Sequence, residues 1–188
     1  MLFDELLESF STKQTVQDAL ENLQASLEHY VNVTGKPFEL GMVDAATEGL
    51  FSSFFSMHLP FQGILKGTVV ISALSSCMQL TGLKAKTVLE NGLVSEIVAE
   101  SLANLAQRMF QASLSIGIVG YPKRFGKQFA TSKSGLFLAF KQHKALKYKI
   151  KYIPISSVDR QDGVLSVLMC LREFIEKDTG QWKNKETI

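Results

Sequence analysis

The sequence predicts an α+β domain, in which a mostly antiparallel sheet carries long helices packed on it. Apolar residues recur at helical spacing in two long segments, residues 15–30 and 91–111. Strand-like segments occur in pairs separated by short turns, which is typical of antiparallel hairpins. Strand and helix do not alternate regularly along the chain, so a parallel sheet with helical crossovers is not expected.

Length and composition indicate a single domain with a helical extension. The chain has 188 residues, of which 46% are hydrophobic, enough for a substantial core. We expect an N-terminal helical segment over residues 1–35 that packs on the domain. The α+β domain then covers residues 36–175, and a polar tail covers residues 176–188.

Several features point to a cytoplasmic protein. No apolar run is long enough to span a bilayer, and the acidic start MLFDELLESF is unlike a signal peptide. Cys77 and Cys170 lie in apolar segments without metal-ligand spacing, so we expect reduced thiols in the core.

The first half of the chain is predicted to contain helices followed by a hairpin. Residues 2–10 form a short amphipathic pattern, and residues 15–30 form a stronger one. Residues 38–49 match neither the helical period nor the strand period of apolar residues well, so their secondary structure is left open. The Phe- and Ser-rich residues 50–59 pair with residues 64–74 across a turn that contains Pro60 and Gly63, and we interpret the two segments as a β-hairpin.

The second half begins with a long helix and continues as strands. Asn91 and Gly92 are typical of a helix start, and no proline interrupts the segment 91–111. Residues 115–119 read as a strand, and residues 136–140 and 146–155 as a hairpin. Residues 164–171 are nearly all apolar, which predicts a last strand in the centre of the sheet.

The polar face of the long helix is the candidate site. Glu96, Glu100 and Asn104 follow each other at intervals of four, so they share one ridge, and Gln107 lies on the neighbouring ridge. A carboxylate can accept bonds from a lysine, and a carboxamide can orient a water molecule with its donor and acceptor ends. The alternative is a solvated helix face with no chemical role.

Charge is distributed unevenly, although the net charge is only +2. Residues 101–158 contain no Asp or Glu and many lysines, whereas nine of the 18 Asp and Glu residues lie in residues 1–58. The basic half could meet nucleic acid, an anionic membrane or an acidic protein. It could equally dock on the acidic half of its own chain or of a second subunit.

The order of segments resembles that of one known family. The strand segment GILKGTVVISAL precedes a short helix, a long helix that carries Glu and Asn, and a strand that ends near a proline. This layout, over residues 50–172, resembles the CheC/CheX chemotaxis phosphatase family. The resemblance implies a cytoplasmic protein of bacterial signalling that binds a phosphorylated response regulator such as CheY and hydrolyses its aspartyl phosphate. It also implies a homodimer.

The signature of that family, Glu-x-x-Asn on the long helix, is incomplete in this sequence. The resemblance implies that the Glu pairs with a lysine of the regulator and that the Asn positions the attacking water. Aligning Glu96 with the family Glu places Ala99 at the Asn position and Ala103 at the position of a glycine. Aligning Asn104 with the family Asn places Ser101 at the Glu position. Glu100 and Asn104 could substitute for the Glu and Asn of the signature, but they are four residues apart instead of three, which shifts their relative position on the helix.

Two functions follow from these observations. The first is the phosphatase, with the catalytic residues Glu96, Glu100 and Asn104 and the binding residues Gln107, Arg108, Lys123 and Arg124. The alternative is a non-catalytic homodimeric protein-binding module on the same fold, which the broken motif favours. No cofactor is expected, and the scattered His29, His58 and His143 predict no metal site. No motif supports nucleic-acid binding, and neither nucleic acid nor membrane is an expected partner.

Overall fold

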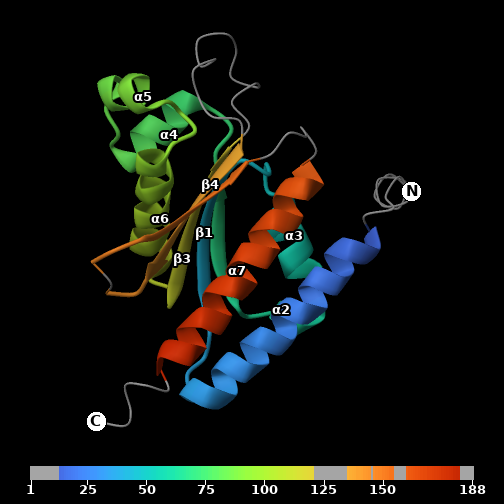
Figure 1. Cartoon of the computed structure of the whole chain (residues 1–188). Coiled ribbons are helices and arrows are strands. Elements are labelled where there is room, and N and C mark those ends of the chain that lie inside the picture. The colour runs from blue at the N-terminus through green and yellow to red at the C-terminus, as the bar shows by residue number, and fades with distance from the viewer. Residues whose placement is uncertain (1–12, 121–134, 145, 155–159, 183–188) are drawn as a thin grey trace. The chain divides into compact units, whose positions relative to one another are not determined.

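The computed structural model describes residues 13–120, 135–144, 146–154 and 160–182 (Figure 1). The strands are β1 (Leu40–Ala45), β2 (Leu65–Val70), β3 (Leu114–Gly120), β4 (Gly135–Gln142) and β5 (Lys149–Pro154). The helices are α2 (Lys13–Thr34), α3 (Leu50–Met57), η1 (Leu59–Phe61), α4 (Leu74–Thr81), α5 (Ala85–Asn91), α6 (Glu96–Phe110) and α7 (Arg160–Trp182). In these ranges, no helix is both long enough and apolar enough to cross a membrane. The helix expected at residues 2–10 lies outside them.

The chain divides into two compact units. One consists of Met1–Phe38 and Val164–Ile188, and the other of Glu39–Gly163. In the first unit, Ser26 on α2 donates a hydrogen bond of 2.9 Å to Glu176 on α7. Arg172 also donates to Glu176, at 2.7 Å, and this bond lowers the pKa of the Glu176 carboxyl. The helix predicted over residues 15–30 is confirmed as α2.

The second unit is built on a mixed five-stranded sheet of order β2-β1-β3-β4-β5. β1 is parallel to β2 and to β3, whereas β4 is antiparallel to β3 and to β5. The predicted combination of helices with a sheet that contains antiparallel pairs is therefore confirmed. The parallel β1-α3-β2 connection was not predicted, because β1 falls in the segment that the sequence left open.

The hairpin predicted over residues 50–74 is wrong. Residues 50–57 form helix α3, and only β2 is a strand, parallel to β1. Phe51 and Phe55 are four residues apart and both fully buried, which is helical spacing. Phe55 also stacks on Phe61, with ring centroids 4.4 Å apart. The high strand propensity of Phe misled the prediction, whereas the spacing of the rings indicates a helix.

The strand predicted over residues 164–171 is also wrong, because this segment belongs to α7. Val164, Val167, Leu168 and Leu171 are buried at helical spacing, and Met169 between them is exposed. An apolar run of eight residues fits a buried strand or a helix equally well. The buried positions continue to Phe174 and Ile175, and this greater length distinguishes the helix.

The long helix is shorter than predicted. Asn91 and Gly92 end α5, and Gly92 has a positive φ of 83°. Ser95 then precedes the first turn of α6, so the helix begins at Glu96. Gly and Asn are frequent at helix C-termini as well as at helix starts, and here they mark an end. The predicted strands near 115–119, 136–140 and 146–155 are confirmed as β3, β4 and β5.

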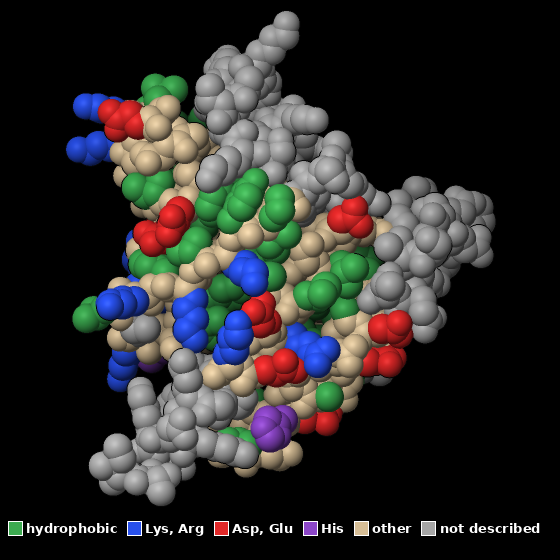
Figure 2. Space-filling model, viewed as in Figure 1, with side chains coloured by type: hydrophobic (Ala, Val, Ile, Leu, Met, Phe, Trp, Pro, Cys, Tyr) green, Lys and Arg blue, Asp and Glu red, His purple; other side chains and the backbone are tan. Residues whose placement is uncertain are grey.

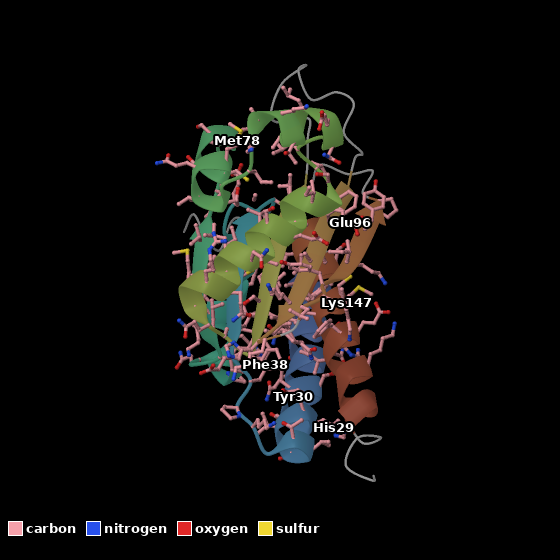
Figure 3. The ribbon with its side chains drawn as sticks, turned by 90° about the vertical axis from the view of Figure 1, so that its left-hand side faces the viewer. His29, Tyr30, Phe38, Met78, Glu96 and Lys147 are labelled. Atoms are coloured by element: carbon pink, nitrogen blue, oxygen red, sulfur yellow. The ribbon has the colours of Figure 1, made fainter. Side chains whose placement is uncertain are left out.

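Helix α6 lies obliquely across one face of the sheet and contacts β1, β3 and β4 most extensively (Figure 3). Glycines allow this close approach. A Cβ atom on Gly117 of β3 would lie 2.2 Å from the backbone oxygen of Ala99 on α6. On β1 and β2, Gly41 and Gly67 are register partners, and the ring of Phe110 covers both positions. The glycines therefore set the position of α6 and of its side chains.

Candidate functional site

The buried side of α6 contains Ala99 and Ala103. When Glu96 is aligned with the family Glu, these two residues stand at the positions of the Asn and of the glycine. Ala99 and Ala103 are fully buried, and their backbone atoms lie against Gly117. A carboxamide at position 99 would therefore face the sheet rather than solvent. When Asn104 is aligned with the family Asn, Ser101 stands at the Glu position. The Ser101 side chain is partly buried and donates a hydrogen bond to the backbone oxygen of Ile97. Neither alignment produces an exposed Glu-x-x-Asn pair.

The predicted acidic residues lie at the N-terminal half of α6. Glu96 lies in the first turn of α6 (Figure 3) and is exposed. Glu100 follows one turn later and is partly buried. Burial raises the pKa of the Glu100 carboxyl, and the negative charge of Glu96 raises it further. The two carboxylates therefore repel each other. Their catalytic role stays a prediction.

Asn104, predicted as catalytic, is bonded to a residue that the sequence did not single out. Lys141 on β4 points toward α6, and its Nζ donates to Asn104 Oδ1 at 2.5 Å. The same Nζ lies 3.4 Å from the hydroxyl of Tyr148 and 5.0 Å from the centre of the Tyr148 ring. The carboxamide oxygen of Asn104 therefore holds an ammonium group, which leaves its amide nitrogen as a donor.

Gln107 is bonded on both sides of its amide. Ser115 on β3 donates to Gln107 Oε1 at 3.1 Å, and Gln107 Nε2 lies 3.0 Å from His143 Nδ1. Because an amide nitrogen only donates, Nδ1 accepts, and the neutral ring carries its proton on Nε2. Ser115 and Lys141 are register partners on adjacent strands, so the two sets of bonds are neighbours. We call the following residues the polar network: Asn104, Gln107, Ser115, Lys141, His143 and Tyr148.

The other predicted binding residues do not belong to the polar network as far as the structure describes them. Arg108 is exposed, and its guanidinium lies 3.4 Å from the backbone oxygen of Leu80 on α4, a different neighbour from those of Gln107. Lys123 and Arg124 lie outside the described residues. The structure thus brings together Asn104 and Gln107 and separates Arg108 from them.

A second cluster, at the carboxyl end of β1, was missed by sequence reasoning. Asp44 is fully buried, and its carboxylate accepts hydrogen bonds from the backbone nitrogens of Ala46, Thr47 and Gly49, at 2.8 to 2.9 Å. The Thr47 hydroxyl also donates to Asp44, and the same oxygen accepts from the nitrogen of Phe51 at the start of α3. An Asp followed three residues later by Thr, just before an apolar helix, was the available signal.

The Asp44 cluster closes the loop that connects β1 to α3. Ligands of open α/β sheets bind at the carboxyl ends of the strands, where loops and helix N-termini offer free donors. Here the carboxylate of Asp44 and the hydroxyl and carbonyl of Thr47 already accept from the backbone nitrogens of the loop and of the first turn of α3. The loop therefore offers little to an anion, and Ala45 and Ala46 carry no reactive group.

Glu48 in this loop has a positive φ of 55°, which is unfavourable for a residue with a Cβ. Replacing Glu48 by glycine should stabilise the protein by about 0.5 to 1 kcal/mol, because relief of the backbone strain exceeds the entropy that glycine adds to the unfolded chain. Urea unfolding measures the change. Glu28→Gly, at an exposed position inside α2, is the control and should destabilise the protein by about 1 kcal/mol. A loss of stability for Glu48→Gly would mean that the Glu48 side chain itself stabilises the loop.

Metal ligands do not gather in either cluster. Within the described ranges, no group of three or more His, Cys, Asp or Glu side chains is placed to hold a metal ion. The chemistry that the polar network supports is therefore that of a lysine ammonium and amide, hydroxyl and imidazole groups.

Comparison with known proteins identifies a different fold from the one expected. No family model and no curated protein matches the chain. Among solved structures, a competence-damaged protein (CinA) superfamily protein from Enterobacter cloacae is 21% identical, with a TM-score of 0.67 over 82% of this chain and 89% of that one. The competence damage-inducible protein A (ComA) from Klebsiella pneumoniae subsp. pneumoniae MGH 78578 is 14% identical, with a TM-score of 0.69 over 87% and 98%. The competence/damage inducible protein CihA from Agrobacterium tumefaciens is 14% identical, with a TM-score of 0.65 over 83% and 94%.

These similarities show the fold, which is that of CinA superfamily structures. The resemblance to CheC/CheX phosphatases was wrong, and with it the predicted role in chemotaxis and the predicted response-regulator partner. The error has a structural cause. The resemblance depended on the order of segments over residues 50–172, which began with a strand pair over residues 50–74, and the chain instead has the β1-α3-β2 unit there.

Proposed function

We propose that this protein is a divergent member of the CinA superfamily that acts by binding, and that the polar network holds an anionic group of its ligand. The membership part is supported by the shared fold, which covers most of this chain and of its structural neighbours. The binding part is supported by one observation, the environment of Lys141.

Lys141 is a partly buried cation held by neutral groups. Its Nζ is bonded to the amide oxygen of Asn104 and lies near the hydroxyl of Tyr148. In the described part of the chain, no carboxylate forms an ion pair with it. Taking an ammonium out of water is unfavourable unless a charge or hydrogen bonds compensate. An ammonium has three N–H groups, so Lys141 retains donor capacity for a carboxylate or phosphate oxygen.

The surroundings of Lys141 favour an anion. Residues 101–158 contain no acidic side chain, so no negative charge from this segment competes with a ligand for the ammonium of Lys141. Glu96 and Glu100 lie on the N-terminal half of α6, whereas Asn104 and Gln107 lie toward its C-terminal end. The anion is therefore expected beside Asn104 and away from Glu96. His143, whose Nε2 carries the proton in the neutral ring, adds a second donor near the surface.

The other members of the polar network hold these donors in place. Gln107 is fixed by Ser115 on one side and by His143 on the other, and it comes within 3.4 Å of the backbone oxygen of Ala112. Asn104 fixes the ammonium of Lys141. Donors that are oriented before the ligand arrives lose less conformational entropy on binding.

Replacing Lys141 by methionine should weaken the binding of inorganic phosphate about ten- to a hundred-fold, because a hydrogen bond to a charged group contributes about 1.5 to 3 kcal/mol. NMR titration of the full chain, at constant ionic strength, follows the signals of His143 and Tyr148. Lys86→Met is the matched control, since Lys86 is exposed on α5 and pairs with Glu90 at 3.7 Å. Equal affinity for phosphate in Lys141→Met and in the unaltered protein would contradict the proposal.

A further inference from the structure

The hairpin between β4 and β5 ends in a fully exposed leucine. Leu146 is 96% exposed, the largest exposed fraction among the exposed large hydrophobic side chains that the structure describes. Lys144 and Lys147 lie on either side of it, and both are exposed. Figure 2 shows several basic side chains beside hydrophobic ones over the left and middle parts of this face. Figure 3 places Lys147 on the same side of the molecule as Glu96.

The hairpin tip is continuous with the polar network. Tyr148 follows Lys147 directly, and its hydroxyl lies 3.4 Å from Lys141 Nζ at the base of the same hairpin. Lys141, Lys144 and Lys147 therefore lie within seven consecutive residues, 141–147, around the exposed Leu146. A projecting apolar side chain surrounded by cations can insert into a soft anionic surface. It does not form a groove into which a side chain of a partner protein could fit.

We propose that the β4-β5 hairpin docks on an anionic lipid surface, with Leu146 entering the boundary of the acyl chains and the lysines contacting the headgroup phosphates. This inference rests on the proposed function, because the phosphate groups of the lipids are the anions that Lys141 meets. It departs from the sequence-based expectation, which excluded a membrane as a partner. The chemistry is that of peripheral binding, in which apolar insertion and attraction to anionic lipids add together.

Composition favours a lipid surface over a protein partner. The cations of residues 141–149 are lysines, and the segment contains no arginine. Lysine is depleted in protein–protein interfaces, where arginine and aromatic residues are enriched. Near an anionic leaflet, by contrast, each lysine strengthens binding about fivefold. A single leucine on a narrow tip also offers far less area than the roughly 1,000 Å² that a specific protein interface requires.

Vesicle co-sedimentation of the full chain tests the inference. We expect binding to phosphatidylcholine vesicles that contain roughly one-third phosphatidylserine, and little binding to phosphatidylcholine alone. Leu146→Ser should weaken binding about tenfold, because the transfer of one leucine side chain out of water is lost. The double substitution Lys144→Glu with Lys147→Glu should abolish sedimentation with the anionic vesicles.

Matched controls lie on α5. Leu89→Ser removes another exposed leucine, 73% exposed, and Lys86→Glu reverses another exposed lysine. Both should bind vesicles like the unaltered protein. Equal losses of binding for Leu89→Ser and Leu146→Ser would overturn the inference, because the hairpin would then have no special role. Equal binding to neutral and anionic vesicles would also overturn it, because the charge of the lipid would then not matter.

A phosphate titration separates this inference from the proposed function. Leu146→Ser should bind free inorganic phosphate like the unaltered protein, because Leu146 is not a member of the polar network. Phosphate binding without any vesicle binding would overturn the lipid inference and leave the proposed function standing. Vesicle binding that depends on Leu146 but not on Lys141 would support the hairpin as the docking element and contradict the role of the polar network.

Discussion

Replacing Gly117 by alanine is expected to destabilise the protein by about 3 kcal/mol or more. The new Cβ would lie 2.2 Å from the backbone oxygen of Ala99 and 2.4 Å from the backbone nitrogen of Ala103. Backbone atoms inside a helix cannot rotate away, so α6 as a whole would have to move from the sheet. Urea unfolding followed by circular dichroism measures the loss.

Gly67→Ala is the informative comparison for Gly117→Ala. A Cβ at position 67 would also be too close to its neighbour, at 2.2 Å, but that neighbour is the ring of Phe110. A side chain at the end of a helix can change its rotamer, so the cost should be smaller. Combining Gly67→Ala with Phe110→Ala should cost less than the sum of the two single changes. A Gly117→Ala protein as stable as the unaltered one would mean that α6 does not pack as closely as described.

Replacing Asp44 by alanine is expected to cost about 3 to 5 kcal/mol. The carboxylate accepts from the backbone nitrogens of Ala46, Thr47 and Gly49, and alanine would leave these donors in the loop without a partner. Thr47 would also lose the acceptor of its hydroxyl, and Thr47 in turn caps Phe51 at the start of α3. Thermal unfolding should show a decrease in Tm of about 6 to 20 °C for a chain of this size.

Two variants control for the loss of a carboxylate. Asp44→Asn keeps one acceptor oxygen and should lose less stability than Asp44→Ala. Asp18→Ala removes an exposed carboxylate from α2 and should change the stability by less than about 0.5 kcal/mol. If Asp44→Ala and Asp18→Ala had the same stability, the bonds of Asp44 to the loop would contribute nothing, and the loop would have to be held by its other contacts.

The elements that the sequence predicted correctly are those whose pattern is long and periodic. Helix α2 and most of α6 follow from apolar residues that recur every three or four positions. β5 follows from lysines that alternate with half-buried residues on a strand. The predictions failed where the apolar run was short. Residues 50–59 and 164–171 fit a strand or a helix locally, and contacts elsewhere, such as Phe55 with Phe61, distinguish the two.

The candidate site was predicted in part. Asn104 and Gln107 were identified because they stand on the polar side of a helix, and periodicity is a local property. Their partners Lys141 and His143 are 37 and 36 residues further along the chain. No pattern within one segment reports which strand will lie beneath a helix. The same limit applies to the alignment that places Ala99 at the Asn position, because only the packing of α6 on Gly117 shows that Ala99 is buried.

Local patterns in the sequence were enough to predict helix α2, most of helix α6, the antiparallel strands of the second half and the concentration of lysines in residues 101–158. These are local properties of composition and period. Three other features depend on the complete fold: the parallel β1-α3-β2 unit, the burial of Asp44 inside its loop and the contact of Lys141 with Asn104. Each of these depends on atoms that meet because the whole chain has folded, and burial and hydrogen bonding have their energetic effect only after the groups have been brought together.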